Sequence, residues 1–454
     1  MLEGLEISVV KFSEMKNENG ELRIDSNFFL KRYLSEKNNL LNKKIPKLGN
    51  IAFVTDGQHG YYERDEKSKI HMLAARNCKN FFADLMDAEP LAKWVDDKNK
   101  RSSLQEKDIV LSTRGTVGFC AIVLEDVLPA NINQDVARIQ LLTNDIIPEF
   151  LIIYLNCKYG QDWMIKNQTG MVQQGISLDK VRQIPIPIFP DTFQSKIESI
   201  VKSAHAKLEE SKSLYSQAED LLLGELGLKD WQPKNTLHTT KKFSDFAQSG
   251  RLDAEYYQPK YDEIEKAIKS YKGGYDIVSN LFNQNLDVCD YKKTEYNYVE
   301  IGDVNVGDGS VSFNKVDTSE LPDNAKRVLH KNDILISKVR PYRGAVAIID
   351  FEQEDLIGSG AFTVLQEKSS YKKETLQILF RTAVYKDWLL KWNVGSSYPV
   401  IKDEDILNLP IPILPEQIQT KSASLIQQSF ECKAQSKQLL EDAKRMVEEE
   451  IEKN

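Results

Sequence analysis

Two short proline-rich stretches in this chain are near copies of each other. Residues 184–190 read IPIPIFP and residues 409–415 read LPIPILP, 225 residues further on. Proline fixes φ and removes an amide donor, so alternating prolines cannot continue a helix and end a sheet edge. A long segment without proline follows each stretch, and the last proline is tolerated at a first helical turn. We predict that each stretch is a stiff extended segment leading from a globular domain into a long helix.

Other parts of the chain repeat at nearly the same offset. KDIVLSTRGTVG at 107–118 aligns with NDILISKVRPYRG at 332–344, and RIDSNFF at 23–29 aligns with RLDAEYY at 251–257. The matches come in the same order in both halves, which is the mark of an internal repeat. The sequence therefore predicts two copies of one unit, each about half of the chain.

The segments after the proline stretches carry a helical pattern. Apolar and small residues recur at alternating steps of four and three, which is typical of a helix that faces another helix. Each helix would be roughly 50 Å long at 1.5 Å per residue. The seam positions on which we expect partners to dock are Ile197, Val201, Leu208, Tyr215, Leu222, Ile426, Leu440 and Val447.

The parts before these helices have the short β-branched runs of strands, with turns between them. We expect an α+β fold with two β-rich globular domains and two long coiled-coil helices. The predicted domains are a globular domain at 1–190, a helix at 191–227, a second globular domain at 228–414 and a second helix at 415–454.

Composition narrows the class of protein. Apolar residues make up 41% of the 454 residues, which is enough for real cores, and no apolar run approaches the roughly 20 residues of a membrane span. The five cysteines are scattered, which fits a reducing cytoplasm and not a structural zinc site. The N-terminus is acidic where a signal peptide is basic. We expect a cytoplasmic protein.

Motifs for catalysis are missing from the sequence. It contains no phosphate-binding G-x-x-x-x-G-K-[ST], no G-x-G-x-x-G and no paired histidines at metal-ligand spacing. Asp-Glu-Lys at 65–67 fits the end of a nuclease motif, but a charged loop explains it better. We predict no catalytic residues, no metal and no cofactor.

The ordered motifs resemble one protein family. DGQHGYYERDEKSKIHMLAARNCKN at 56–80, then 107–118, then GISLDKVRQIPIPIFP at 175–190 and a long helix resemble the specificity (S) subunit of type I restriction–modification systems. The resemblance covers nearly the whole chain. In the second half RPYRG replaces RGTVG and the DGxH segment is missing, so its contact residues are less defined.

The resemblance implies an architecture and partners. Each half would be a target-recognition domain followed by a helix, with the two helices antiparallel, and each domain would read one half of a bipartite DNA target. The implied partners are double-stranded DNA, two DNA adenine methyltransferase (M) subunits docked on the helices, and restriction (R) subunits. The chain itself would be a non-catalytic subunit, with no membrane partner.

Residues that could touch DNA lie in turns and polar-aromatic clusters. DNA binding needs cations at phosphates and fork-like donors at base edges. The segment 191–227 carries four lysines against seven acidic residues, so it is a better surface for protein than for DNA. The candidate contacts are Gln58, His59, Tyr61, Tyr62, Arg76, Asn77, Arg114, Gln173 and Gln174 in the first half, and Lys338, Arg340, Arg343, Ser396 and Tyr398 in the second.

Two other classes of function stay open at this point. One is a stand-alone DNA-binding regulator with the same two domains and no enzymatic partner. The other is a specificity segment of a fused restriction enzyme, which the missing catalytic motifs disfavour.

Overall fold

The chain folds into two compact units. The computed structural model describes residues 9–13, 26–40, 45–79, 81–170, 174–234, 236, 238–395 and 398–453. Unit 1 comprises Met1–Lys207 with Ala434–Asn454, and unit 2 comprises Leu208–Lys433. Each unit therefore contains one globular part and a portion of both long helices.

Unit 1 is built on a five-stranded sheet and a smaller three-stranded sheet. The first has the order β1 (Ala52–Asp56), β8 (Val136–Leu141), β5 (Ile109–Ser112), β6 (Cys120–Ile122), β3 (Phe81–Phe82). The second has the order β4 (Glu89–Pro90), β2 (His71–Leu73), β7 (Ala130–Ile132). Central strand β5 is Ile-Val-Leu-Ser and is buried along its whole length, as a strand covered on both faces must be.

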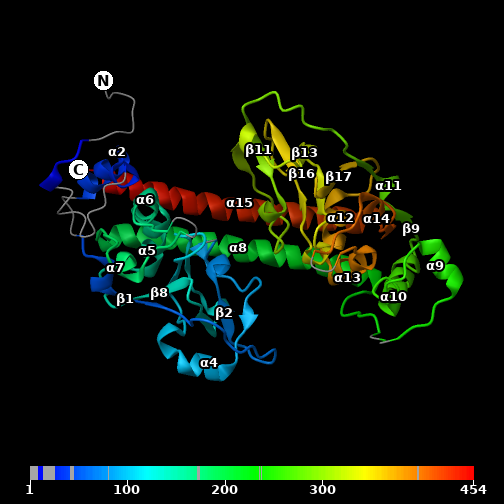
Figure 1. Cartoon of the computed structure of the whole chain (residues 1–454), viewed down its shortest axis with the longest axis horizontal. Helices are drawn as coiled ribbons and strands as arrows, with labels where there is room; N and C mark the ends of the chain where they lie inside the picture. The colour runs from blue at the N-terminus through cyan, green and yellow to red at the C-terminus, as the bar shows by residue number, and fades with distance from the viewer. Residues whose placement is uncertain are drawn as a thin grey trace. The chain divides into compact units, whose positions relative to one another are not determined.

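In unit 1 the helix at Pro148–Asn156, α5, packs against β6 and β3. Figure 1 labels α4, α5, α6 and α7 around the strands β1, β2 and β8. The α-helices are α2 (Lys31–Leu40), α3 (Leu48–Ile51), α4 (Lys93–Lys98), α5 (Pro148–Asn156), α6 (Lys158–Lys166) and α7 (Leu178–Arg182). The 3-10 helices are η1 (Ser26–Phe29), η2 (Ala75–Cys78), η3 (Lys100–Ser102) and η4 (Glu125–Val127).

Unit 2 repeats this plan with two four-stranded sheets and a two-stranded one. The first has the order β10 (Phe282–Gln284), β17 (Phe362–Glu367), β14 (Ile334–Ser337), β15 (Val346–Ile348). The second has the order β12 (Asn314–Asp317), β11 (Glu295–Val299), β16 (Leu356–Ser359), β13 (Ala325–Val328). The two-stranded sheet pairs β18 (Pro410–Pro412) with β9 (Tyr275–Ile277).

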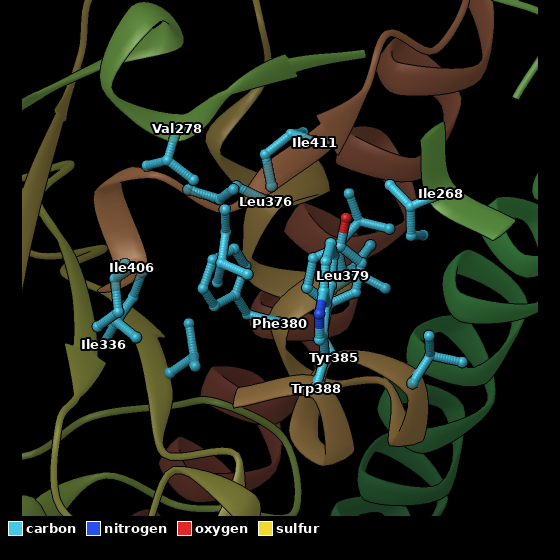
Figure 2. Packing of buried hydrophobic residues seen from close by; sticks show 14 of the residues in the cluster. Ile268, Val278, Ile336, Leu376, Leu379, Phe380, Tyr385, Trp388, Ile406 and Ile411 are labelled. Carbon is cyan, nitrogen blue, oxygen red and sulfur yellow. The ribbon is translucent and has the colours of Figure 1, made fainter. Parts of the chain in front are cut away.

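The helices of unit 2 surround an apolar core (Figure 2). The α-helices are α9 (Phe243–Ser249), α10 (Pro259–Lys269), α11 (Val278–Leu281), α12 (Lys373–Arg381), α13 (Ala383–Leu389) and α14 (Asp403–Leu407). The 3-10 helices are η5 (Ile301–Asp303), η6 (Thr318–Glu320), η7 (Pro341–Arg343) and η8 (Leu390–Trp392). Figure 2 shows Phe380, Tyr385 and Trp388 at the centre of this core, with Ile411 above them.

The internal repeat is visible in backbone detail. Gly170 and Gly395, 225 residues apart, have φ of 104° and 100°, a left-handed conformation that favours glycine. The side chain of Gln194 binds the backbone of Ile147, and that of Gln419 binds the backbone of Lys372, both at 3.0 Å. Residues at one offset therefore make the same structure twice.

The proline stretches pair with other segments and contribute to the cores of the two units. In unit 2 the middle of LPIPILP is strand β18, and Ile411 between its prolines is fully buried. In unit 1 the amide of Ile186 donates to Pro46 O at 3.0 Å, and Ile186 is also buried. The prolines leave the isoleucines facing the core, so each stretch is a paired edge segment that contributes to packing.

Two long helices follow the proline stretches. They are α8 (Asp191–Leu226) and α15 (Glu416–Glu452). Within unit 1, Ser436 Oγ donates to Ala204 O at 2.7 Å. Within unit 2, Ser211 Oγ and Ser429 Oγ lie 2.9 Å apart. The residue numbers of the contacting positions decrease along α15 as they increase along α8, so the two helices run antiparallel. The serine side chains are small, which permits the close approach. Among the described helices, none combines the length and apolarity that crossing a membrane requires.

Candidate nucleic-acid interface

Each unit holds an arginine-bearing turn against a second loop. In unit 1, Arg114 forms a β-bridge with Gly175, just beyond the end of β5. In unit 2, Val339 forms the equivalent bridge with Val400, beyond the end of β14. Both central strands are fully buried, so the turns project from rigid scaffolds, a common place for binding residues.

In unit 2 the turn presents two arginines. Arg343 is exposed, and the guanidinium of Arg340 lies 4.4 Å from the ring centroid of Tyr398. Tyr398 is 61% exposed. The turn thus offers cationic and aromatic groups together on the surface, the chemistry suited to phosphates and bases.

Lys338 is less available than predicted. Its Nζ lies 3.1 Å from Asp403 Oδ1, and Thr363 Oγ1 donates to the same oxygen at 2.6 Å. The lysine side chain is only 18% exposed. Lys338 therefore ties the turn to α14, and most of its charge is already matched.

In unit 1 the arginine of the corresponding turn has an acidic neighbour. Arg114 is half-exposed and its Nη1 lies 3.8 Å from Asp135 Oδ1. Gln174 is exposed beside the bridge to Gly175. The predicted contacts Gln173 and Ser396 lie outside the described residues.

A second polar cluster of unit 1 surrounds Asp56. His59 Nε2 lies 2.7 Å from Asp56 Oδ2, and Arg101 Nη1 lies 2.9 Å from Asp56 Oδ1. Burial acts to raise the pKa of Asp56, but the hydrogen bonds and charges of His59 and Arg101 outweigh it and lower that pKa. Gln58 donates to His59 O at 2.9 Å, and Tyr61 is 90% exposed. In this cluster the side chains of His59, Tyr61 and Arg101 are exposed, and Asp56 and Gln58 are half-buried between them.

The sequence analysis did not identify Arg101 as part of this cluster. It lies 45 residues from Asp56 along the chain, in a short 3-10 helix. No local motif marks it, and only the fold brings the two together.

The other predicted residues of this region have internal roles. Tyr62 donates to Glu89 at 2.5 Å, and burial together with Glu89 raises the pKa of Tyr62 to about 12. Arg76 donates to Asp87 O. Asn77 is fully buried, accepts from Ala74 N at 3.0 Å and donates to Met86 O at 2.9 Å. The DNA contact of Asn77 stays a prediction, and in the structure its side-chain amide is buried and closes the η2 loop.

The predicted docking residues of the long helices lie mostly on the faces that pack within the chain. Six of the eight seam positions are buried inside the chain, namely Ile197, Val201, Leu222, Ile426, Leu440 and Val447, while Leu208 and Tyr215 are half-buried. Tyr215 accepts from Arg381 Nε at 2.5 Å. The heptad seam therefore serves the chain's own packing, and another protein can reach only the outward positions, such as Ser195, Ser199 and Ser203.

The part of the chain that the structure describes contains no cluster of side chains that could bind a metal ion. No group of three or more His, Cys, Asp or Glu side chains there is placed to hold an ion. The five cysteines are all buried, and none of them is in a disulfide bond.

Comparisons with known proteins give the same family in both halves. The model of the type I restriction modification DNA specificity domain matches residues 32–218 and 276–445. The specificity subunit of the type I restriction enzyme EcoBI from Escherichia coli is 26% identical over 151 residues. That alignment covers 33% of this chain and 30% of the relative, so it spans about a third of each.

Solved structures were also matched. The S subunit of a type I restriction–modification system from M. genitalium is 13% identical with a TM-score of 0.41, covering 91% of this chain and 96% of that one. The HsdS subunit from Thermoanaerobacter tengcongensis is 13% identical with a TM-score of 0.29, covering 90% and 96%. Since the family model alone matches more than half of the sequence, once in each half, the chain belongs to the type I restriction–modification DNA specificity domain family.

Proposed function

We propose that this chain is the DNA-specificity subunit of a type I restriction–modification complex, and that units 1 and 2 each read one half of a bipartite target. One observation carries the proposal: both units hold an arginine-bearing turn, beyond the central strand, by the same bridge to a second loop. Two copies of one reading surface in one chain suit a target with two separate halves.

Charge supports DNA binding at the turns. The whole chain has a net charge of −8, which opposes a nonspecific DNA coat. Among the described residues, Arg340 and Arg343 have no carboxylate within ion-pair distance, so their charges are open to a polyanion. Local cations matter more than the total charge for a groove-binding surface.

The proposed DNA contacts are the surface residues of the two turns and the Asp56 cluster. Arg114 and Gln174 in unit 1 and Arg340, Arg343 and Tyr398 in unit 2 would form the turn surfaces. His59 and Tyr61 would add a second surface in unit 1, and Gln58 would hold their loop, because both ends of its side-chain amide are bonded within the protein. Tyr62, Arg76 and Lys338 would act by fixing the loops, because each is already bonded within the protein.

Catalysis would come from partners. We assign methylation to DNA adenine methyltransferase subunits and cleavage to restriction subunits, with no catalytic role for this chain. The methyltransferase subunits would dock on the outward faces of α8 and α15, because the inward faces are occupied by each other.

The test is methylation sequencing of DNA from cells that make this chain together with the methyltransferase encoded beside it. We expect modified adenines in one motif of two half-sites separated by unread bases. The matched control omits this chain, and the motif should then vanish. Co-purification separates the proposal from a stand-alone regulator, which would bind DNA without retaining a methyltransferase. Methylation by the purified chain alone would contradict the assignment of catalysis to its partners.

A further inference from the structure

We propose that Tyr398 is a positioning residue that presents the guanidinium of Arg340 to a guanine edge in the half-site read by unit 2. The inference rests on the proposed function and deepens it by naming the base. Three observations carry it: the backbone conformation of Arg340, the stacking of its guanidinium, and the contrast with Arg114.

The backbone at Arg340 is unusual and firmly held. Its φ of 50° and ψ of 55° place it in the left-handed region, which residues other than glycine rarely adopt. The Arg340 amide donates to Pro399 O at 2.7 Å. After the short η7 turn, Gly344 O accepts from Arg381 Nη1 at 3.2 Å. A costly conformation that the surroundings enforce is a feature of functional sites, and here it fixes where the Arg340 side chain leaves the turn.

The side chain is fixed by an aromatic ring. The Arg340 guanidinium carbon lies 4.4 Å from the centroid of the Tyr398 ring, a cation–π distance. Contact with the ring face restrains the position of the guanidinium, while the N–H donors on its edge can still reach another group. Because Tyr398 follows Gly395, whose φ is 100°, the ring and the arginine come from two loops joined by the bridge between Val339 and Val400.

The arginine of the corresponding turn in unit 1 lies at the position that Val339 takes in unit 2, and it is held differently. Arg114 lies 3.8 Å from a carboxylate oxygen of Asp135. The matching stretch of unit 2, between β16 and β17, reads Gly360-Ala361 and has no carboxylate. The same turn therefore carries a partly neutralised arginine in unit 1 and a stacked one with open donors in unit 2.

A restrained planar fork with open donors suits a base better than a phosphate. In the major groove, guanine alone offers two adjacent acceptors, N7 and O6, that match the fork of an arginine. A phosphate contact requires only a positive charge near the DNA backbone, and the exposed Arg343 can supply that charge without an aromatic ring beside it. The geometry thus points to guanine as the base that Arg340 reads.

The experiment uses the complete complex of this chain with its methyltransferase subunits. Competition binding to duplexes that differ at single positions gives the discrimination at each base pair, and methylation sequencing gives the motif. Arg340→Lys should reduce discrimination at one G·C pair of one half-site by about 5- to 150-fold. Tyr398→Ala should reduce discrimination at the same pair by about 2- to 5-fold, the share expected of a cation–π contact. Tyr398→Phe keeps the ring and should behave as the unmodified chain.

Controls separate this result from misfolding. Tyr342→Ala removes another exposed tyrosine of the same turn, 41% exposed, and should leave discrimination at the G·C pair intact. The other half-site should stay unchanged in every variant, which reports an assembled complex. A uniform loss of affinity at all sequences in Arg340→Lys, or unchanged discrimination in both Arg340→Lys and Tyr398→Ala, overturns the inference. If the unmodified complex methylates no two-part motif, both the proposed function and this inference fail. That outcome is seen without any substitution, so it is distinguishable from a failure of the inference alone.

Discussion

Single residues differ between the two units even where the backbone repeats. Asp108 in unit 1 and Asp333 in unit 2 are both buried and 225 residues apart. Asp108 lies 2.7 Å from Arg138 Nε, whereas Asp333 accepts from the neutral amides of Asn285 and Gln366 at 3.0 and 2.9 Å. Burial raises the pKa of Asp108 above its ordinary value, although the hydrogen bond and the charge of Arg138 act to lower it.

We predict that Asp108→Asn destabilises unit 1 by about 3–5 kcal/mol, because it leaves the buried Arg138 charge unmatched. Asp333→Asn should cost unit 2 less, about 1–3 kcal/mol, since its lost partners are neutral. Hydrogen exchange in mild denaturant measures both, because it resolves the two units. Adding Arg138→Met to Asp108→Asn should restore part of the loss. Equal losses in the two single variants would show that Arg138 is not the cause.

At the scale of elements, α2 docks on α6 through a titratable contact. Arg32 lies 3.8 Å from Asp162, and Asn39 donates to Tyr159 OH at 3.0 Å. Burial, followed by a hydrogen bond with Asp162, raises the pKa of Glu36 to about 8, against the opposing charges of Lys158 and Arg32. In unit 2 the helix α10 places the fully buried Ile264 at the repeated position, so an apolar side chain there takes the place of Glu36.

We predict that docking of α2 weakens as pH rises. A raised pKa in the folded state means that the stabilisation is complete below the ordinary glutamate value of 4.5 and is lost as pH rises through about 8. We expect hydrogen exchange of α2, corrected for intrinsic rates, to show protection that falls between about pH 5 and about pH 9, because this range spans the ordinary and the raised pKa of Glu36. Glu36→Gln should keep the protection nearly constant. A profile unchanged by that substitution would assign the pH dependence to another group.

A second contact between elements fastens a loop of unit 2 to its helix pair. Lys433 of α15 binds Asp308, and its Nζ donates to Ser310 Oγ at 2.6 Å. Arg381 donates to Val306 O at 2.9 Å and to Tyr215 OH of α8. Burial acts to raise the pKa of Asp308, but Lys433 outweighs it and lowers that pKa.

We predict that Lys433→Met destabilises unit 2 by about 1.5–3 kcal/mol, the cost of losing charged hydrogen bonds. The lowered pKa of Asp308 means that its contribution is present above 3.8 and disappears as pH falls through the folded value. The difference between the variant and the unmodified chain should therefore shrink in acid. Lys437→Met, at an exposed position of the same helix, is the control and should change little. Chemical denaturation at neutral and acidic pH checks both statements.

The long helices, the repeat and the family could be predicted, because heptad spacing and a constant offset are properties of the sequence itself. The family is confirmed by the match in both halves. The pattern could not say whether the seam of α8 meets its own chain or a partner, since the periodicity is the same in both cases. Nor could it pair Arg101 with Asp56, or assign Asn77 to a loop closure, because these depend on contacts that only the folded chain brings together.

At the scale of the whole molecule, the division into units falls within the helices. Unit 1 ends at Lys207 in α8 and resumes at Ala434 in α15. The connection between the two units therefore consists of two helical crossings, each unbroken. We propose that this connection sets the distance between the two half-sites on DNA.

We predict that lengthening both helices together changes the spacer and not the half-sites. One heptad inserted after Lys207 and one after Lys433, at the unit boundary, preserves the seam. It lengthens the connection by about 10 Å at 1.5 Å per residue, or about 3 bp at 3.4 Å per base step. Methylation sequencing of the complex should find both half-sites unchanged and about 3 more unread base pairs between them.

The control is a heptad in α8 alone, which makes the two crossings unequal in length and should abolish assembly, because the contact of Ser436 with Ala204 in unit 1 and that of Ser211 with Ser429 in unit 2 can no longer both form. Phase also matters, since B-DNA turns once in about 10–10.5 bp and a longer connection must still bring both turns to their grooves. The double insertion should therefore methylate more slowly even at its own best spacer. If it remains active at the original spacer, the two helices do not set the distance, and the reading surfaces must be coupled in another way.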